Sequence, residues 1–409
     1  MQVFSKTKKI EGKIKASADD FVVNEISKNG TTLECGAARS AADLGYQEGS
    51  GSFCVFVMEK RNWNTIQSLK EIARRAGRGA GSIGFAGTKD RVAVTTQLCS
   101  IFGTTPDFVK SIKIKDIEVL GAWQAQSPVK LGDLLGNRFA INVRTQDKNW
   151  EEAINNINSE LHGLFPNYYG AQRFGNRKLN VEIGLSILKG ELERAAMLFL
   201  TSTQGEEMED AVNARAKLNE DGNFMRALEY FPKYLKYERS MLSSLALNPR
   251  DFAKALRVLP RQLLLMFVHS VESHIFNVSL GSRLESGRIL PDIGATACAL
   301  NFYGFPDLSK VGRYGEDPGA RLELGNIVGY NSKESELSAE EKAEMEKLGI
   351  SISDFKVKRI PEASCKGSKR PLFAPYLNFS SKQSVNGFTL EFSLPAGSYA
   401  TAFLNEFLY

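Results

Sequence analysis

The sequence lacks the residue clusters that mark metal sites and disulfide frameworks. Its 409 residues include five cysteines, widely spaced and without a C-x-x-C pair. Histidine is scarcer still, at three residues, and no H-E-x-x-H pattern occurs. Two of them, His269 and His274, lie in an apolar helical run, where we interpret them as helix-face residues rather than ligands or bases. We therefore predict no metal, no cofactor, no disulfide bonds and a reducing compartment.

Long apolar runs and a strong net charge are absent too. The longest apolar run, residues 263–268, is far too short to cross a bilayer. The lysine-rich residues 1–15 have no apolar core of the kind found in a signal peptide. We therefore expect a cytoplasmic protein without membrane contact. Because the net charge is only +5, binding to nucleic acid would need a local cluster of basic residues.

The order of strand-like and helix-like patterns predicts an α+β protein with a discontinuous domain. Alternating apolar residues, as in 139–143 and 388–394, predict strands near both ends of the chain. Residues 181–280 have helical spacing instead, for example in 183–200 and 252–275. Since the length favours two domains, we predict one domain from residues 1–162 and 366–409, with residues 163–365 inserted into it.

A basic window between residues 60 and 91 surrounds one aspartate in a glycine-flanked turn. The acids of this window are Glu71 and Asp90. An isolated acid on a basic surface is typical of an enzyme that holds a polyanion while one carboxylate reacts with it. The alternative is a surface turn with local ion pairs. The basic residues are Lys60, Arg61, Lys70, Arg74, Arg75, Arg78, Lys89 and Arg91.

Two further stretches have features of binding motifs. Residues 166–175 (PNYYGAQRFG) form an aromatic, glycine-punctuated turn with Gln172 and Arg173. Such a turn can stack on a splayed base or grip a backbone; the alternative is a packed turn between domains. Residues 79–84 match G-x-G-x-x-G, but a predicted helix precedes the glycines where a nucleotide site requires a strand. We therefore expect no nucleotide cofactor.

Several stretches resemble the TruD family of tRNA pseudouridine synthases, and they occur in the order that the family has. The first is Lys15 followed by residues 20–25 (DFVVNE), and the second is 85–91 (FAGTKDR). The others are 135–139 (LGNRF), 166–175 and 394–401 (LPAGSYAT). The resemblance spans nearly the whole chain.

The resemblance implies a pseudouridine synthase fold, which is a mixed, mostly antiparallel sheet with flanking helices, and a helix-rich insertion domain. It implies that the chain isomerises one uridine of tRNA, usually position 13 in the D arm, to pseudouridine. The product is an isomer, so the reaction requires no metal, redox cofactor or second substrate. The expected partner is tRNA, and we expect a monomer.

The resemblance also assigns the site. Asp90 would act as nucleophile or base on a uridine flipped out of its stack, with Lys15 as its basic partner. A nearby cation keeps the carboxylate charged when a base covers it. Phe139 would stack on the uracil and Asn137 would read its edge. Glu391 is a candidate second carboxylate. From the residues alone, a core position is favoured for Phe139, and Glu391 is equally a solvent-facing strand residue.

The predicted RNA contacts come from the basic window and from the aromatic turn. A competing interpretation is a non-catalytic RNA-binding or RNA-folding protein that uses the same basic cleft. Asp90 distinguishes the two, because an acid facing phosphates weakens binding and needs a chemical reason to be there. The predicted contacts are Arg74, Arg75, Arg78, Lys89, Arg91, Gln172 and Arg173.

Overall fold

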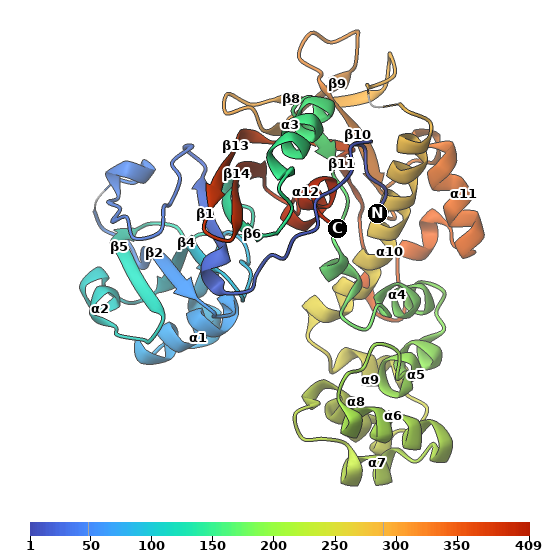
Figure 1. Ribbon diagram of the computed structural model, residues 1–409. Helices are drawn as coiled ribbons and strands as arrows, with labels where there is room; N and C mark the ends of the chain where they lie inside the picture. Colours follow the sequence, from blue (N-terminus) through green and yellow to red (C-terminus); the bar gives the residue numbers. More distant parts are fainter. Residues whose placement is uncertain (48, 289) are drawn as a thin grey trace. The chain divides into compact units, whose positions relative to one another are not determined.

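The computed structural model (Figure 1) describes residues 1–47, 49–288 and 290–409 and divides into two compact units. The sheet unit contains residues 3–167, 298–322 and 373–409. The helical unit contains residues 1–2, 168–297 and 323–372. Both units are therefore assembled from segments that lie far apart in the sequence.

An eight-stranded sheet, counted over the described residues, forms the sheet unit. Its strand order is β13-β14-β6-β1-β4-β2-β5, with β3 paired to β4. These pairings are antiparallel except that of β1 with β4, which is parallel. The strands are β1 Phe21–Ser27, β2 Phe53–Arg61, β3 Ile83–Phe85, β4 Val94–Phe102, β5 Ile117–Ala125, β6 Leu134–Arg144, β13 Leu377–Ser384 and β14 Gly387–Pro395.

The register of the sheet aligns one buried face across its central strands. Val23 of β1 lies opposite Phe139 of β6, which lies opposite Phe392 of β14. Side chains on a strand alternate between faces, so these three share a face. Aromatic contacts join this face to two helices: Phe392 meets Phe403 with ring centres 4.4 Å apart, and Phe388 meets Trp150 at 4.8 Å. The chain's last strand is therefore fixed in the same core as its first.

The helices of the sheet unit follow from their capping and apolar spacing. The helix α1 starts after Asn64, whose side chain accepts hydrogen bonds from two backbone amides. Its residues Leu69, Ile72 and Ala73 pack into the core beside β2 and β4. The helices of this unit are α1 Thr65–Arg75, α2 Pro106–Ser111, α3 Trp150–Leu161 and α12 Ala400–Phe407, and the short strands β7 Leu164–Pro166 and β12 Phe373–Pro375 form a separate pair.

A long helix, α10, forms the centre of the helical unit's core. It places Phe267, Val271 and Ile275 against the shorter helices of that unit. It is long and apolar enough to cross a membrane, but 61% of its most apolar stretch is buried within the protein, as in the core helix of a soluble fold. The helices are α4 Asn180–Leu188, α5 Leu192–Thr201, α6 Glu209–Asp221, α7 Phe224–Tyr230, α8 Lys236–Leu247, α9 Phe252–Arg257, α10 Arg261–Glu285 and α11 Ala339–Leu348. The remaining strands are β8 Thr296–Leu300, β9 Pro306–Arg313, β10 Leu322–Ile327 and β11 Ser368–Pro371.

Two predicted helices are each divided by a residue that cannot continue a helix. The stretch 183–200 is α4 and α5, separated at Gly190, whose φ of 75° is left-handed. The stretch 252–275 is α9 followed by α10, with Pro260 immediately before α10. Helical periodicity continues across both interruptions, so it did not reveal them.

The two units differ from the predicted domain bounds in one main respect. Residues 298–322, which the predicted insertion 163–365 includes, belong to the sheet unit. Tyr303 of this segment donates a hydrogen bond to the carbonyl oxygen of Asn29 at 2.7 Å, and its ring packs against Gly30. The segment is too polar to show which core it joins. The assignment of catalytic and insertion domains stays a prediction.

Candidate active site

Lys15 and Asp90 form an ion pair within the sheet unit. The Nζ atom of Lys15 lies 2.7 Å from Oδ1 of Asp90. The side chains are 23% and 29% exposed, so solvent reaches the carboxylate. The ammonium also lies 4.0 Å from the centre of the Phe21 ring on β1, a favourable cation–π contact. Asp90 is therefore accessible and is oriented by a cation that is itself held in place.

The backbone of Lys15 is in an uncommon conformation. Its φ of 59° is left-handed, which few non-glycine residues adopt. Two flanking contacts impose it. On one side Lys13 and Arg144 exchange backbone hydrogen bonds of 2.9 Å, and on the other side Ser17 begins a capped turn. Such conformations are concentrated at functional sites.

Hydrogen bonds from three elements of the sheet unit fix the loop that carries Asp90. They reach main-chain atoms, so they set the course of the loop independently of its exposed side chains. The bonds run from Gln97 Nε2 to the Gly87 oxygen (3.1 Å), from the Lys89 amide to Thr65 Oγ1 (3.0 Å) and from Lys60 Nζ to the Asp90 oxygen (2.8 Å).

The strongest anchor of this loop is a buried ion pair between Glu25 and Lys89. Nζ of Lys89 lies 2.6 Å from Oε2 of Glu25, and the two side chains are 3% and 0% exposed. The other oxygen of Glu25 accepts a hydrogen bond from the Leu98 amide at 2.9 Å. Because both charges are removed from water, leaving either one unpaired is costly. The pair ties the residue next to Asp90 to the centre of the sheet.

Lys60 is a second buried cation next to Asp90, and its charge alone does not separate it from the other basic residues. It is fully buried, and burial lowers the pKa of its ammonium from 10.5 to about 8. The nearby charge of Asp90 opposes this shift. The apolar residues around Lys60 in β2 were the only available signal of its inward position.

Asn137 and Phe139 lie on the sheet face that carries Glu25. Asn137 is opposite Glu25 in the β1–β6 register, and its Oδ1 is buried without a hydrogen-bond partner among the described residues. Phe139 is only 4% exposed, stacks on Phe392 and meets the edge of Phe21. In this structure the ring occupies a core position, and its stacking on uracil stays a prediction.

Glu391 lies away from this site. Its neighbours Leu390 and Phe392 are fully buried, so the alternation of β14 directs Glu391 to the face opposite Phe139. There it pairs with Lys382 and Arg138, each at 3.0 Å, and these cations lower its pKa. The role of Glu391 as a second catalytic carboxylate stays a prediction.

The comparisons with known proteins give one family for the chain. The family model described as tRNA pseudouridine synthase D (TruD) matches residues 1–407. The chain belongs to the TruD family.

Its relatives and a solved structure agree with this family. A protein of Methanosarcina mazei named "Probable tRNA pseudouridine synthase D" is 32% identical, over 97% of this chain and 93% of the relative. A protein of the same name from Thermococcus onnurineus is 36% identical, over 98% and 95%. The crystal structure of a TruD protein from Methanosarcina mazei has a TM-score of 0.75 and 30% identity, over 100% of this chain and 95% of that one. The predicted family, fold class and enzyme class, an isomerase, are thereby confirmed.

The predicted RNA contacts of this TruD protein differ in exposure and in the unit that carries them. The ammonium of Lys89 is buried against Glu25, whereas Arg91 is exposed. All seven contacts stay predictions. Arg74 and Arg75 are exposed at the end of α1, and both donate hydrogen bonds to Glu71. Arg78 donates to the carbonyl oxygen of Gly103. Gln172 and Arg173 belong to the helical unit, where the Arg173 guanidinium lies 5.2 Å from the centre of the Tyr169 ring.

The buried ion pair predicts that removing one of its two charges destabilises the protein more than removing both. In the TruD variant Lys89→Met the Glu25 carboxylate stays buried without its cation, so the free energy of unfolding should fall by about 3–5 kcal/mol. Urea unfolding can be followed by tryptophan fluorescence, because all three tryptophans lie in the sheet unit. Adding Glu25→Gln should restore most of the loss. The exposed control Arg91→Met should change stability by less than about 0.5 kcal/mol. An equally stable Lys89→Met protein would contradict the pair.

The lowered pKa of Lys60 predicts that the free energy of unfolding rises with pH in the alkaline range. Between pH 8 and 10.5 the unfolded chain keeps the Lys60 proton that the folded protein has released, so the free energy of unfolding increases with pH. From pH 7.5 to 9.5 the Lys60 contribution should be about 2 kcal/mol. Lys60→Met should flatten the rise measured by urea unfolding, whereas Lys70→Met, at an exposed position of α1, should retain it. Equal slopes in both variants would refute the assignment.

Proposed function

We propose that this protein isomerises a uridine of tRNA to pseudouridine and that Asp90 carries the reaction on a flipped-out base. The observation that supports this most directly is the accessible Asp90 carboxylate, 2.7 Å from the Lys15 ammonium, on a loop whose backbone is fixed from the interior. Family membership supports the coarser activity, tRNA uridine isomerisation. The geometry supports the residue assignment.

The reaction breaks the bond between C1′ and N1, turns the uracil and joins C5 to C1′. The proton leaving C5 and the proton gained at N1 balance, so the product is an isomer. An aspartate can attack the base, capture C1′ or remove a sugar proton, and each role requires its charged form. When the uridine covers Asp90 and excludes water, the charged form loses solvation. Lys15 compensates for this loss because its ammonium stays beside the carboxylate.

Asn137 supports recognition of uracil at the same face of the sheet. Its buried Oδ1 accepts no hydrogen bond from the described residues, and a buried acceptor without a donor is destabilising. The N3–H group of uracil is a donor of suitable chemistry. We assign Asn137 the role of accepting this hydrogen bond, which would also distinguish uracil from cytosine, whose N3 has no hydrogen.

The remaining assignments rest on the family resemblance. The proposed target is position 13 in the D arm, and the enzyme acts as a cytoplasmic monomer without a redox cofactor. The exposed basic residues Arg74, Arg75 and Arg91 are proposed to contact phosphates of the tRNA. Because extruding a base costs a few kcal/mol, these contacts would supply part of the energy of base flipping.

Asp90→Asn should separate catalysis from binding. Turnover should fall at least about 10³-fold, while tRNA affinity stays level or rises slightly, because a negative charge facing phosphates is removed. Tritium release from tRNA labelled at C5 of uridine measures turnover, and carbodiimide-stop primer extension locates the product. Asp107→Asn, at an exposed position of α2, is the matched control. Normal tritium release by Asp90→Asn would overturn the assignment and favour the non-catalytic RNA-binding interpretation.

Asn137→Leu should impair the reaction without impairing the fold. Among the described residues the amide oxygen has no hydrogen-bond donor, so the free energy of unfolding should stay level or increase. The lost contact to uracil should reduce kcat/KM by about 10- to 100-fold. Urea unfolding and tritium release measure the two effects on the same samples. An active, stable variant would exclude Asn137 from substrate recognition.

A further inference from the structure

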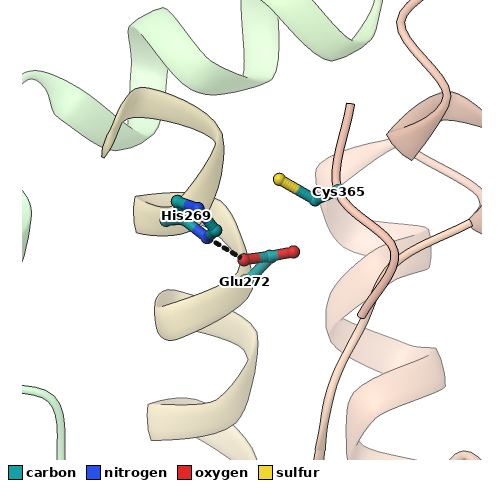
Figure 2. Close-up of side chains that lie close together, drawn as sticks. All are labelled: His269, Glu272 and Cys365. Carbon is teal, nitrogen blue, oxygen red and sulfur yellow. Dashed lines mark hydrogen bonds and ion pairs between the residues drawn. The ribbon is translucent and has the colours of Figure 1, made fainter. Parts of the chain in front are cut away.

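Three side chains with metal-binding chemistry meet inside the helical unit, away from the residues assigned to the reaction. Figure 2 shows His269 and Glu272 on α10 and, facing them from another segment, Cys365. One ligand atom from each residue can be chosen so that all three lie within 4.8 Å of one another. The cluster belongs to a single unit, so its geometry does not depend on the arrangement of the two units.

The backbone places these residues firmly. His269 and Glu272 are three positions apart on α10, which puts both on one side of the helix. The amide of Cys365 donates to the Phe355 oxygen at 3.1 Å, and its carbonyl accepts from the Tyr330 amide at 2.9 Å. The thiol therefore faces Glu272 from a segment that is held on both sides.

The Glu272 carboxylate is the unusual member, because no lysine or arginine pairs with it among the described residues. Its side chain is 2% exposed, and Nδ1 of His269 lies 2.7 Å from its Oε2. The Cys365 thiol donates to the carbonyl oxygen of Ala363, with 3.7 Å between sulfur and oxygen. A buried carboxylate is costly unless a cation or several donors compensate it. One histidine is weak compensation.

We propose that His269, Glu272 and Cys365 bind one divalent cation of the zinc type. Imidazole nitrogen, carboxylate oxygen and thiolate sulfur are the ligands that Zn²⁺ takes in proteins. Bound Zn²⁺ would cancel the two negative charges of Glu272 and of the Cys365 thiolate, so the buried site would become neutral. His269 is 40% exposed, which leaves a side open for a water as fourth ligand.

The metal would take the place of the thiol proton of Cys365. On binding, the sulfur–hydrogen bond breaks, a sulfur–metal bond forms and one proton leaves to solvent. His269 would bind through Nδ1 as a neutral imidazole, with its ring proton on Nε2. Ligands of tetrahedral zinc lie about 3.3–3.8 Å apart, so the side chains need to shift by about 1 Å.

The site would join α10 to the segment before β11 within the helical unit. We therefore assign it a structural role, separate from the isomerisation. Sequence spacing could not reveal it, because only the pair on α10 is local and Cys365 lies far along the chain. The prediction of no metal site from the absence of C-x-x-C pairs would be wrong in this one respect.

Cobalt binding tests the proposal directly. The full-length protein, freed of metal with a chelator, is titrated with Co²⁺, which takes zinc ligands and gives a thiolate-to-cobalt charge-transfer absorption band. We expect the band to saturate at one Co²⁺ per chain, to disappear when Zn²⁺ is added, and to be accompanied by release of one proton. Zn²⁺ should also raise the melting temperature measured by far-ultraviolet circular dichroism.

Substitutions assign the ligands. Cys365→Ser should abolish the charge-transfer band, and Glu272→Gln and His269→Gln should each weaken Co²⁺ binding at least about 10-fold. The control is Cys298→Ser, which removes another buried cysteine and should leave the band intact. Circular dichroism confirms that each variant is folded. A wild-type protein without the band, or a band that persists in folded Cys365→Ser, would overturn the proposal and leave the cluster as a hydrogen-bond network.

Discussion

The buried ion pair between Glu25 and Lys89 is the contact on which the candidate active site depends. Glu25 is placed in the middle of β1, between strands that pair with it on both sides. Its carboxylate holds the Lys89 ammonium and the Leu98 amide at once. Because a charge in the interior is tolerated only beside its partner, the loop has one stable course through the core. Asp90, the next residue, is positioned by that course.

Basic residues around Asp90 therefore serve different purposes although they look alike in the sequence. Lys89 and Lys60 are buried and hold the loop, through Glu25 and through the Asp90 carbonyl oxygen. Lys15 meets the carboxylate itself and remains partly exposed. The arginines of α1 and Arg91 are exposed instead, so they can reach a polyanion. Charge alone does not divide these groups, because burial decides what each cation can reach.

The sheet unit explains why residues so far apart in the sequence share one site. β6 pairs with β1 on one side and with β14 on the other, so the ends of the chain are joined through a strand from its middle third. The same register fixes which side chains face Asn137 and Phe139 and which face away. It places Phe392 in the core and Glu391 on the opposite face. A register shift of one residue would exchange the faces of Phe392 and Glu391.

The family, the α+β class and, through the family resemblance, the pairing of Lys15 with Asp90 could be predicted from the sequence. These signals are local or occur as ordered motifs. The inward direction of Lys89, the covered ring of Phe139 and the meeting of Cys365 with His269 and Glu272 became visible in the folded chain alone. Glu25 lies 64 residues from Lys89, and composition and periodicity carry no information about which distant side chain fills the space next to a buried charge.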